Sequence, residues 1–236
     1  MKKDMAKRMA EHLSAGHKPG PQKVALVTGA SRGLGAALAE ALGHRGYHVI
    51  AVARTVGALE ELDDRLRNAG CQPATLAPMD VMESPAMMQL TAAIAKRWGG
   101  LDVWVHTAIH AAPLTPAGHV DGKDWENSFK VNATATQNLI GLLEPLLRAR
   151  HGVAIIPDDP RGGQKFFGAY GASKAAQMAI ASSWKAESAR LGPEVLMPHP
   201  KPMPTAIRGR FFPGEDRSTL SPCTIEAEAI LDEAGL

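Results

Sequence analysis

Tyr170 and Lys174 are the residues whose types and spacing most directly suggest chemistry. They lie four residues apart in a segment, 169–176, whose composition is typical of a helix. That spacing places both side chains on one helix face, with Cβ atoms about 5–6 Å apart. A free tyrosine, with a pKa of about 10, is a poor acid near neutrality, but a neighbouring ammonium lowers that pKa. The pair is therefore predicted to exchange a proton with a substrate oxygen, unless it is only a ring and a lysine on a helix surface.

A glycine-rich turn over residues 28–35 is predicted to hold the phosphates of a dinucleotide. The turn follows an apolar strand directly and opens a helix. Glycine permits a tight turn and close approach of the backbone to a pyrophosphate, which then meets the free N–H groups of the helix start. The residues of this turn expected to bind the cofactor are Gly29, Ser31, Arg32, Gly33, Leu34 and Gly35.

Two arginines favour NADP(H) over NAD(H) as the cofactor. In dinucleotide-binding folds an acidic residue about 20 positions after the glycines binds the ribose 2′-hydroxyl, whereas an arginine there accommodates a 2′-phosphate. The predicted second strand ends at Arg54 without a carboxylate, and Arg32 in the turn adds a second guanidinium. A guanidinium binds phosphate with two hydrogen bonds. The alternative is that both arginines are solvated surface residues.

The elements that must position these residues alternate between short apolar runs and longer stretches of helical period. We predict strands at 24–28, 48–53, 74–78, 102–106, 153–156 and 195–197, and helices at 33–44, 58–69, 86–98, 125–149 and 169–191. Strands that alternate with helices of this length indicate βαβ units, and strands that are apolar on both faces indicate helices on both sides. We therefore predict one Rossmann-like α/β domain over residues 23–236, with a doubly wound parallel sheet of about six strands.

Taken together, the motifs resemble the short-chain dehydrogenase/reductase family. Besides the T-G-x-x-x-G-x-G turn, they comprise Asp80-Val81, 101–105, Val131-Asn132, Tyr170-x-x-x-Lys174 and Pro200 with Thr205. The resemblance implies an NADP(H)-dependent oxidoreductase that interconverts a carbonyl and an alcohol by hydride transfer. In that scheme Tyr170 is the acid or base, and Lys174 also binds the nicotinamide ribose.

The resemblance assigns roles to five further residues. Asn132 would be the third catalytic residue and would hold a water of a proton relay. Asp80 would bind the adenine amino group, and Val81 would pack near the adenine ring. Thr205 would contact the nicotinamide amide, and Ala108 is expected beside the cofactor.

Three positions depart from the family's pattern. Pro157 stands where the family places the serine that orients the substrate oxygen, and proline carries no hydroxyl. Ile109 and Lys201 each replace a glycine of the pattern. Asp158 would supply the missing donor only if protonated, and otherwise the Asp158-Asp159 pair is interpreted as solvated loop charge. A second hypothesis therefore stays open: an NADP(H)-binding protein with weak or no catalysis that acts through protein partners.

Composition narrows the remaining classes. The 236 residues carry a net charge of +2, which does not favour nucleic acid as a partner, and no run approaches the ~18–20 apolar residues of a membrane span. The two cysteines are far apart, and His106 and His110 lack a third ligand at metal-binding spacing, so no metal site is expected. We expect a cytoplasmic protein with a small carbonyl or alcohol substrate.

Two expectations concern the ends of the chain. Residues 1–22 are interpreted as a flexible tail, or alternatively as a short basic helix with Met5, Met9 and Leu13 on one face. A homodimer is a further expectation, although the chain ends at Leu236 without an obvious seventh strand, which often builds the subunit interface in the family.

Overall fold

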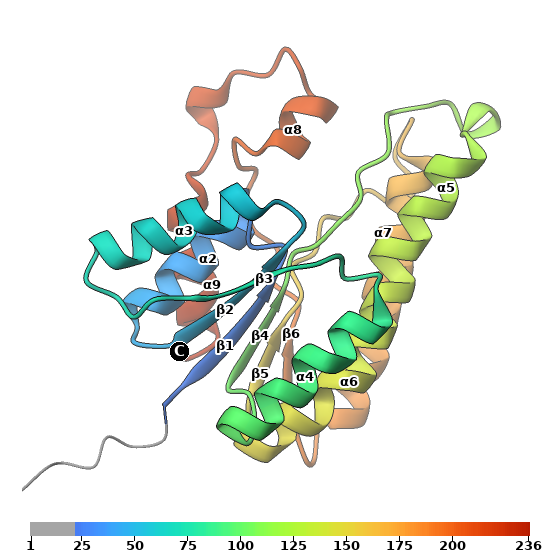
Figure 1. The fold of residues 1–236 in the computed structure, drawn as a ribbon. Coiled ribbons are helices and arrows are strands. Elements are labelled where there is room, and N and C mark those ends of the chain that lie inside the picture. Colours follow the sequence, from blue (N-terminus) through green and yellow to red (C-terminus); the bar gives the residue numbers. More distant parts are fainter. Residues whose placement is uncertain (1–21) are drawn as a thin grey trace, which may run out of the picture.

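One six-stranded parallel sheet forms the centre of the protein (Figure 1). The computed structural model describes residues 22–236. The strands are β1 (Val24–Thr28), β2 (His48–Ala53), β3 (Thr75–Pro78), β4 (Val103–His106), β5 (Val153–Ile155) and β6 (Glu194–Leu196). Their order is β3-β2-β1-β4-β5-β6, and every neighbouring pair is parallel. This arrangement confirms the predicted doubly wound sheet.

Helices cover both faces of the sheet (Figure 1). One face carries α2 (Gly33–His44), α3 (Val56–Asn68) and α9 (Cys223–Glu233), and the other carries α4 (Ser84–Trp98), α6 (Ala135–Arg150) and α7 (Gly168–Ser188). Two further helices, α5 (Gly122–Phe129) and the short α8 (Ala206–Phe211), lie toward the carboxyl ends of the strands. A crevice between loops at that edge is where ligands bind in doubly wound sheets.

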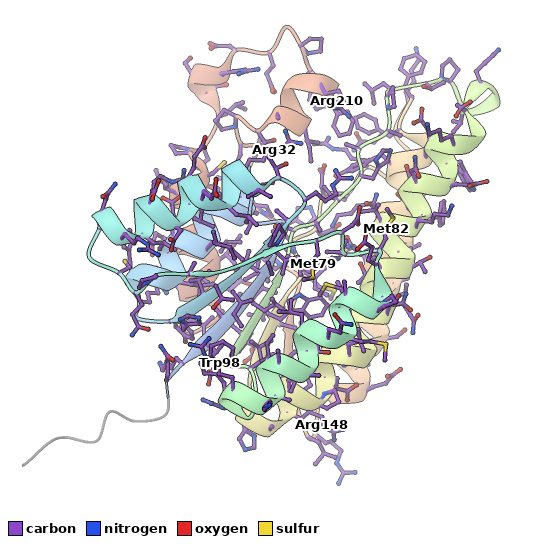
Figure 2. All side chains as sticks on the ribbon, in the orientation of Figure 1. Arg32, Met79, Met82, Trp98, Arg148 and Arg210 are labelled. Carbon is purple, nitrogen blue, oxygen red and sulfur yellow. The ribbon has the colours of Figure 1, made fainter. Side chains whose placement is uncertain are left out.

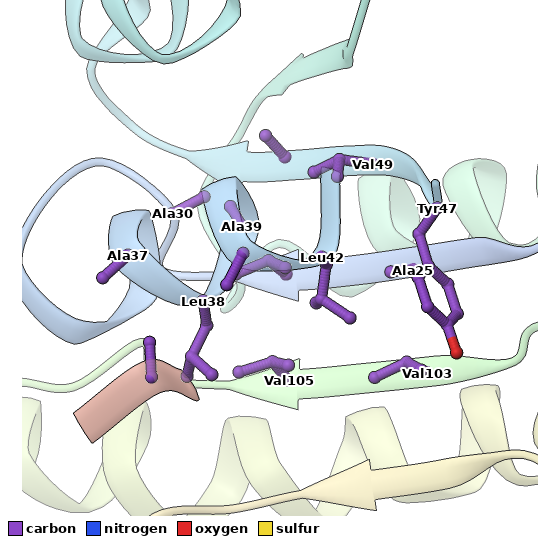
Figure 3. Packing of buried hydrophobic residues seen from close by; sticks show 14 of the residues in the cluster. Ala25, Ala30, Ala37, Leu38, Ala39, Leu42, Tyr47, Val49, Val103 and Val105 are labelled. Atoms are coloured by element: carbon purple, nitrogen blue, oxygen red, sulfur yellow. The ribbon is translucent and has the colours of Figure 1, made fainter. Parts of the chain in front are cut away.

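The core consists of two apolar layers, one on each side of the sheet. Successive side chains of a strand point to opposite faces, so Ala25 and Val27 pack on the α2 side, whereas Val24 and Leu26 pack on the α4 side. Figure 3 shows the first layer, in which Leu38 of α2 approaches the strand residues. All five residues of β1 are fully buried, which explains why this strand is apolar except for Thr28.

The predicted helix at 125–149 is wrong as a single element. The structure has α5, then a π-helical segment (Lys130–Thr134), then α6. The π segment contains Asn132, and its wider turn lies where α5 and α6 meet. The π segment itself contains no glycine or proline that would predict it from the sequence. The nearest proline, Pro145, lies well inside α6. A widened turn of this kind is common at functional sites.

Two helices near the C-terminus, α8 and α9, were not predicted. The proline-rich stretch before them conceals their helical period, and α9 begins directly after Pro222. Ala227, Ile230 and Leu231 of α9 are buried against the α2 side of the sheet. The last described element is thus a helix rather than a seventh strand, and a homodimer stays a prediction.

The N-terminal prediction falls almost wholly on residues 1–21, which lie outside the described residues, as do Met5, Met9 and Leu13. Gln22 contacts the domain, because its side-chain oxygen accepts a hydrogen bond from Trp98 Nε1 at 3.2 Å. Within residues 22–236, no helix combines the length and the apolar character needed to span a bilayer. The cytoplasmic location stays a prediction.

Candidate active site

The carboxyl ends of the strands open on a cavity of about 440 Å³. Its wall joins the glycine turn, the segments that follow β2 to β5, the start of α7 and the segment 200–212. Ligand pockets generally measure about 300–1,000 Å³. The predicted site residues that line it are Gly29, Ser31, Arg32, Gly33, Leu34, Gly35, Arg54, Asp80, Val81, Ala108, Tyr170, Lys174 and Thr205. Asn132 lies behind this wall and is fully buried.

The glycine turn has the geometry that a phosphate site requires. Gly29 and Gly33 adopt φ values of +93° and +57°, which side chains with a Cβ rarely allow. A Cβ at Gly29 would lie 2.5 Å from the backbone nitrogen of Ala108, and one at Gly35 would collide with the Gly29 carbonyl. The first turn of α2 has no side-chain cap and no acidic residue, so its N–H groups are available to an anion. The residues present therefore fit a dinucleotide pyrophosphate.

Arg32 and Arg54 lie beside this turn, at the carboxyl edge of the sheet. Arg32 is exposed and lies at the same end of the molecule as Arg210 (Figure 2). The Arg54 side chain is 72% exposed, and its guanidinium lies 3.7 Å from the Asp80 carboxylate. Asp80 also accepts a hydrogen bond from the Met82 backbone N–H at 3.0 Å. The two guanidinium groups are thus accessible at the wall of the cavity, and Asp80 lies beside that of Arg54.

Tyr170 also lines the cavity and lies in the first turn of α7, and the part of the cavity around it is called the tyrosine end. It is 3% exposed, and its hydroxyl donates a hydrogen bond to Asp159 Oδ2 at 3.0 Å. Burial, together with the charge of Asp159 and this hydrogen bond, raises the pKa of Tyr170 above its usual range. The prediction that a neighbouring ammonium lowers this pKa is therefore wrong for the structure described.

The hydrogen bonds of the Lys174 ammonium explain why it does not lower the pKa of Tyr170. Its Nζ donates hydrogen bonds to the Pro157 carbonyl and to Gln177 Oε1, each at 2.6 Å, rather than to the phenol. Burial lowers the pKa of Lys174 to about 8, and Asp158 and Asp159 oppose that shift. The lysine thus shares one helix face with Tyr170, as its spacing predicts. Its ammonium, however, donates hydrogen bonds to the loop after β5 and to Gln177 of its own helix.

Asn132 connects the loop after β4 to α7. Its side-chain oxygen accepts from the His110 backbone N–H at 2.7 Å, and its amide nitrogen donates to the His110 carbonyl and to Ser173 Oγ, both at 2.9 Å. The Asn132 carbonyl accepts a hydrogen bond from Thr136 Oγ1 at 2.8 Å. These contacts hold Val131, the neighbour of Asn132, at the cavity wall. The relay water that the resemblance implies stays a prediction.

His106 is held inside the protein by two threonines. Its ring nitrogens lie 2.8 Å from Thr28 Oγ1 and 2.9 Å from Thr136 Oγ1. Burial, with a contribution from Lys174, lowers its pKa to about 3, so the ring is neutral. Both nitrogens are engaged with hydroxyl groups. Among residues 22–236, no group of three metal-ligating side chains is placed to hold an ion.

The interpretation of Asp158 and Asp159 as solvated loop charge is wrong for Asp159. One of its carboxylate oxygens accepts from Tyr170, and the other lies 2.8 Å from Arg161 Nε. Asp158 lies 3.7 Å from the His199 ring and does not bond the tyrosine. The contact depends on how the loop after β5 folds back over α7, which adjacency in sequence does not reveal.

An aromatic wall completes the tyrosine end of the cavity. The rings of Tyr170 and Phe211 lie 5.0 Å apart, and those of Phe167 and Phe211 lie 4.9 Å apart. The guanidinium of Arg161 lies over Phe167 at 5.5 Å, in cation–π geometry. Ile109 packs against this group and lines the cavity. Phe211 belongs to α8, so sequence reasoning that missed this helix also missed its contribution.

Comparison with known proteins identifies the family. The family model for short chain dehydrogenase matches residues 23–216. The chain belongs to the short-chain dehydrogenase/reductase family. A structure from Pseudomonas syringae described as a short chain dehydrogenase superposes with a TM-score of 0.82 and 27% identity, covering 91% of this chain and 90% of that one. The six-stranded sheet described above is therefore the fold of this family.

Two further relatives of this dehydrogenase/reductase chain are informative. Glycine betaine reductase ATRR of Emericella nidulans is 33% identical over 214 residues, which cover 88% of this chain but only 15% of that protein. A metagenomic short-chain oxidoreductase, solved in complex with NADP, superposes with a TM-score of 0.77 and 25% identity over 91% of this chain and 90% of that one. Family membership thus covers most of the chain, whereas the fungal reductase extends far beyond the matched segment.

Proposed function

We propose that the protein is an NADP(H)-dependent oxidoreductase that interconverts the carbonyl and alcohol forms of a small molecule. The observation that carries this proposal is one cavity that brings together the glycine turn, Arg32, Arg54 and the Tyr170–Lys174 pair. When bound, the nicotinamide supplies or receives the hydride. The residues of the protein bind the cofactor, hold the substrate oxygen and move one proton.

Cofactor binding is proposed to use backbone at one end of the cavity and side chains at the other. The N–H groups at the start of α2 would meet the pyrophosphate, and Arg32 and Arg54 would bind a 2′-phosphate. An ammonium has three N–H donors, and two of those of Lys174 form hydrogen bonds with Pro157 and Gln177. The third is proposed to bind a hydroxyl of the nicotinamide ribose.

Tyr170 is proposed to exchange the proton with the substrate oxygen. Its hydroxyl must first leave Asp159, with which it forms a hydrogen bond of 3.0 Å. In reduction the tyrosine proton then passes to the developing alkoxide, and in oxidation the alcohol returns a proton to the tyrosine oxygen. Pro157 offers no hydroxyl to that oxygen, and loss of one such donor typically slows catalysis about 10²–10³-fold. We therefore expect slow turnover.

A second candidate function is an NADP(H)-binding protein with weak or no catalysis that acts through protein partners. The observation that favours it is the hydrogen bond from the Tyr170 hydroxyl to Asp159, with Pro157, which has no hydroxyl, in the same cavity wall. In this case the cavity binds the cofactor and the protein surface carries the function. A homodimer is one form that such a partner could take.

NADPH oxidation across a panel of aldehydes, ketones and quinones separates the two candidates. For the enzyme, Tyr170→Phe should lower kcat/KM by about 10²–10⁴-fold, because it removes the proton donor and leaves the ring in place. NADPH affinity, measured by fluorescence titration, should change little in that variant. If wild type and Tyr170→Phe give equal rates on every substrate while NADPH binds, the enzyme proposal fails and the second candidate holds.

A further inference from the structure

Gln177 lies one helical turn after Lys174 on α7 and reaches the same buried ammonium. Its side-chain oxygen accepts a hydrogen bond from Lys174 Nζ at 2.6 Å, and Gln177 is only 1% exposed. The second acceptor for this ammonium is the Pro157 carbonyl, also at 2.6 Å. Because an ammonium only donates hydrogen bonds, the oxygen end of the glutamine amide must face it.

The other end of the same amide is anchored in the protein interior. The Gln177 amide nitrogen donates to Thr136 Oγ1 at 2.8 Å, and Thr136 Oγ1 in turn donates to the Asn132 carbonyl at 2.8 Å. The ring of His106 also lies 2.9 Å from this threonine oxygen. Rotation of the amide would turn its NH₂ group toward the ammonium and break both contacts. A buried polar network that is satisfied in this way fixes its members in one arrangement.

We propose that Gln177 is a positioning residue that fixes the Lys174 ammonium, so that its remaining N–H group points toward the ribose of the nicotinamide. The part of this inference that concerns the ribose rests on the proposed function. The resemblance to the family assigns a relay water to Asn132. Here the side chains of Gln177 and Thr136 connect Lys174 to the Asn132 carbonyl through three successive hydrogen bonds.

The charges around Lys174 define what a titration should show. Asp158 and Asp159 face the ammonium from the loop after β5, Tyr170 lies on the same helix, and neutral His106 faces it from β4. A hydrogen bond to the charged form of a lysine favours that form. Removal of the Gln177 oxygen should therefore lower the pKa of Lys174, and a carboxylate in its place should raise it.

Two variants test this directly in the cofactor-free protein. Gln177→Met keeps the length of the side chain but removes the acceptor, whereas Gln177→Glu adds a negative charge. NMR titration of ¹³C-labelled lysine, with the Lys174 signal assigned through Lys174→Arg, should show the midpoint about one pH unit lower in Gln177→Met and at least about one unit higher in Gln177→Glu. The control Gln137→Glu makes the same chemical change at an exposed position of α6 and should leave the midpoint in place.

Cofactor binding supplies the second readout. Between neutral and alkaline pH, NADPH affinity should fall as Lys174 loses its proton, and this fall should begin at lower pH in Gln177→Met and at higher pH in Gln177→Glu. At pH 8 the first variant should bind NADPH about fivefold more weakly than wild type, because a midpoint one unit lower leaves about one fifth as much protonated Lys174. A merely structural glutamine would weaken the fold without moving the two variants in opposite directions.

The outcomes separate this inference from the proposed reaction. Midpoints that stay unchanged in both variants, or shift in the same direction, would overturn the positioning role. If Gln177→Met fails to fold, Gln177→Glu still decides, because an unchanged midpoint in that variant also overturns it. Opposite shifts without turnover of any carbonyl would support the positioning role while the proposed reaction fails.

Discussion

The two ends of the cavity differ in whether backbone or side chains form their walls. At the glycine-turn end, Gly29 and Gly35 lie where a Cβ would collide with backbone, and the N–H groups at the start of α2 have no side-chain cap. At the tyrosine end, the side chains of Ile109, Tyr170 and Phe211 line the cavity, and Pro157 lies where the resemblance to the family predicts a serine. A site made by the backbone tolerates few substitutions because the fold depends on it. A site made by side chains can change its chemistry while the fold persists.

The largest effect is expected when one methyl group is added at the glycine-turn end. Gly35→Ala should destabilise the protein by about 1–3 kcal/mol or more and abolish measurable NADPH binding, because its Cβ would collide with the Gly29 carbonyl. Chemical denaturation and fluorescence titration measure the two effects.

The matched control for this substitution is Gly57→Ala, in the exposed first turn of α3, where the added Cβ meets no atom within 4 Å beyond its chain neighbours and its own helix backbone. That variant should keep its NADPH affinity and be equally stable or up to about 1 kcal/mol more stable. Equal effects of the two substitutions would show that the turn has no special steric requirement.

The next largest effect concerns the choice of cofactor. Replacing Arg32 and Arg54 together by serine should weaken NADPH binding about 10–100-fold, because two charge-assisted contacts to the 2′-phosphate are lost. NADH, which lacks that phosphate, serves as the control and should bind with nearly unchanged affinity. Parallel losses for both cofactors would mean that the arginines act on the fold or on the pyrophosphate instead.

A smaller effect is expected at the tyrosine end. Burial and Asp159 raise the pKa of Tyr170, so alcohol oxidation, which needs the phenolate, should become faster as pH rises. Asp159→Asn removes the charge that holds the phenol proton, and this rise should therefore shift to lower pH, with a rate gain of about 3–10-fold near neutrality. A pH–rate profile in the oxidation direction measures the shift.

Asp158→Asn provides the comparison for that variant. Asp158 also raises the pKa of Tyr170 but does not form a hydrogen bond with it, so its removal should shift the profile less. If both variants shift the profile equally, the Tyr170–Asp159 hydrogen bond has no specific role.

Sequence reasoning succeeded where a pattern is local. Strands β1 and β2 were predicted with their observed bounds, because their residues are apolar on both faces and are bounded by turns. The glycine turn and the Tyr170–Lys174 spacing likewise place their residues at the cavity. These features are written in short segments whose geometry depends little on the rest of the chain.

What escaped prediction depends on contacts between distant segments. The hydrogen bond from Tyr170 to Asp159 requires the loop after β5 to fold back over α7, and the anchoring of Gln177 requires α6 to lie against that helix. The π segment around Asn132 has no sequence breaker, and α9 was concealed by the prolines before it. Each of these features is fixed by packing rather than by local propensity.

The proposed effect of Pro157 on turnover is tested most directly by the rate of Pro157→Ser with saturating NADPH. This substitution restores a hydroxyl at the tyrosine end and keeps the backbone carbonyl that binds Lys174. We expect a gain in kcat of at least about tenfold, rising toward 10²-fold, while NADPH affinity stays unchanged. An unchanged or lower rate, with NADPH binding intact, would contradict the claim that the missing hydroxyl at position 157 slows turnover.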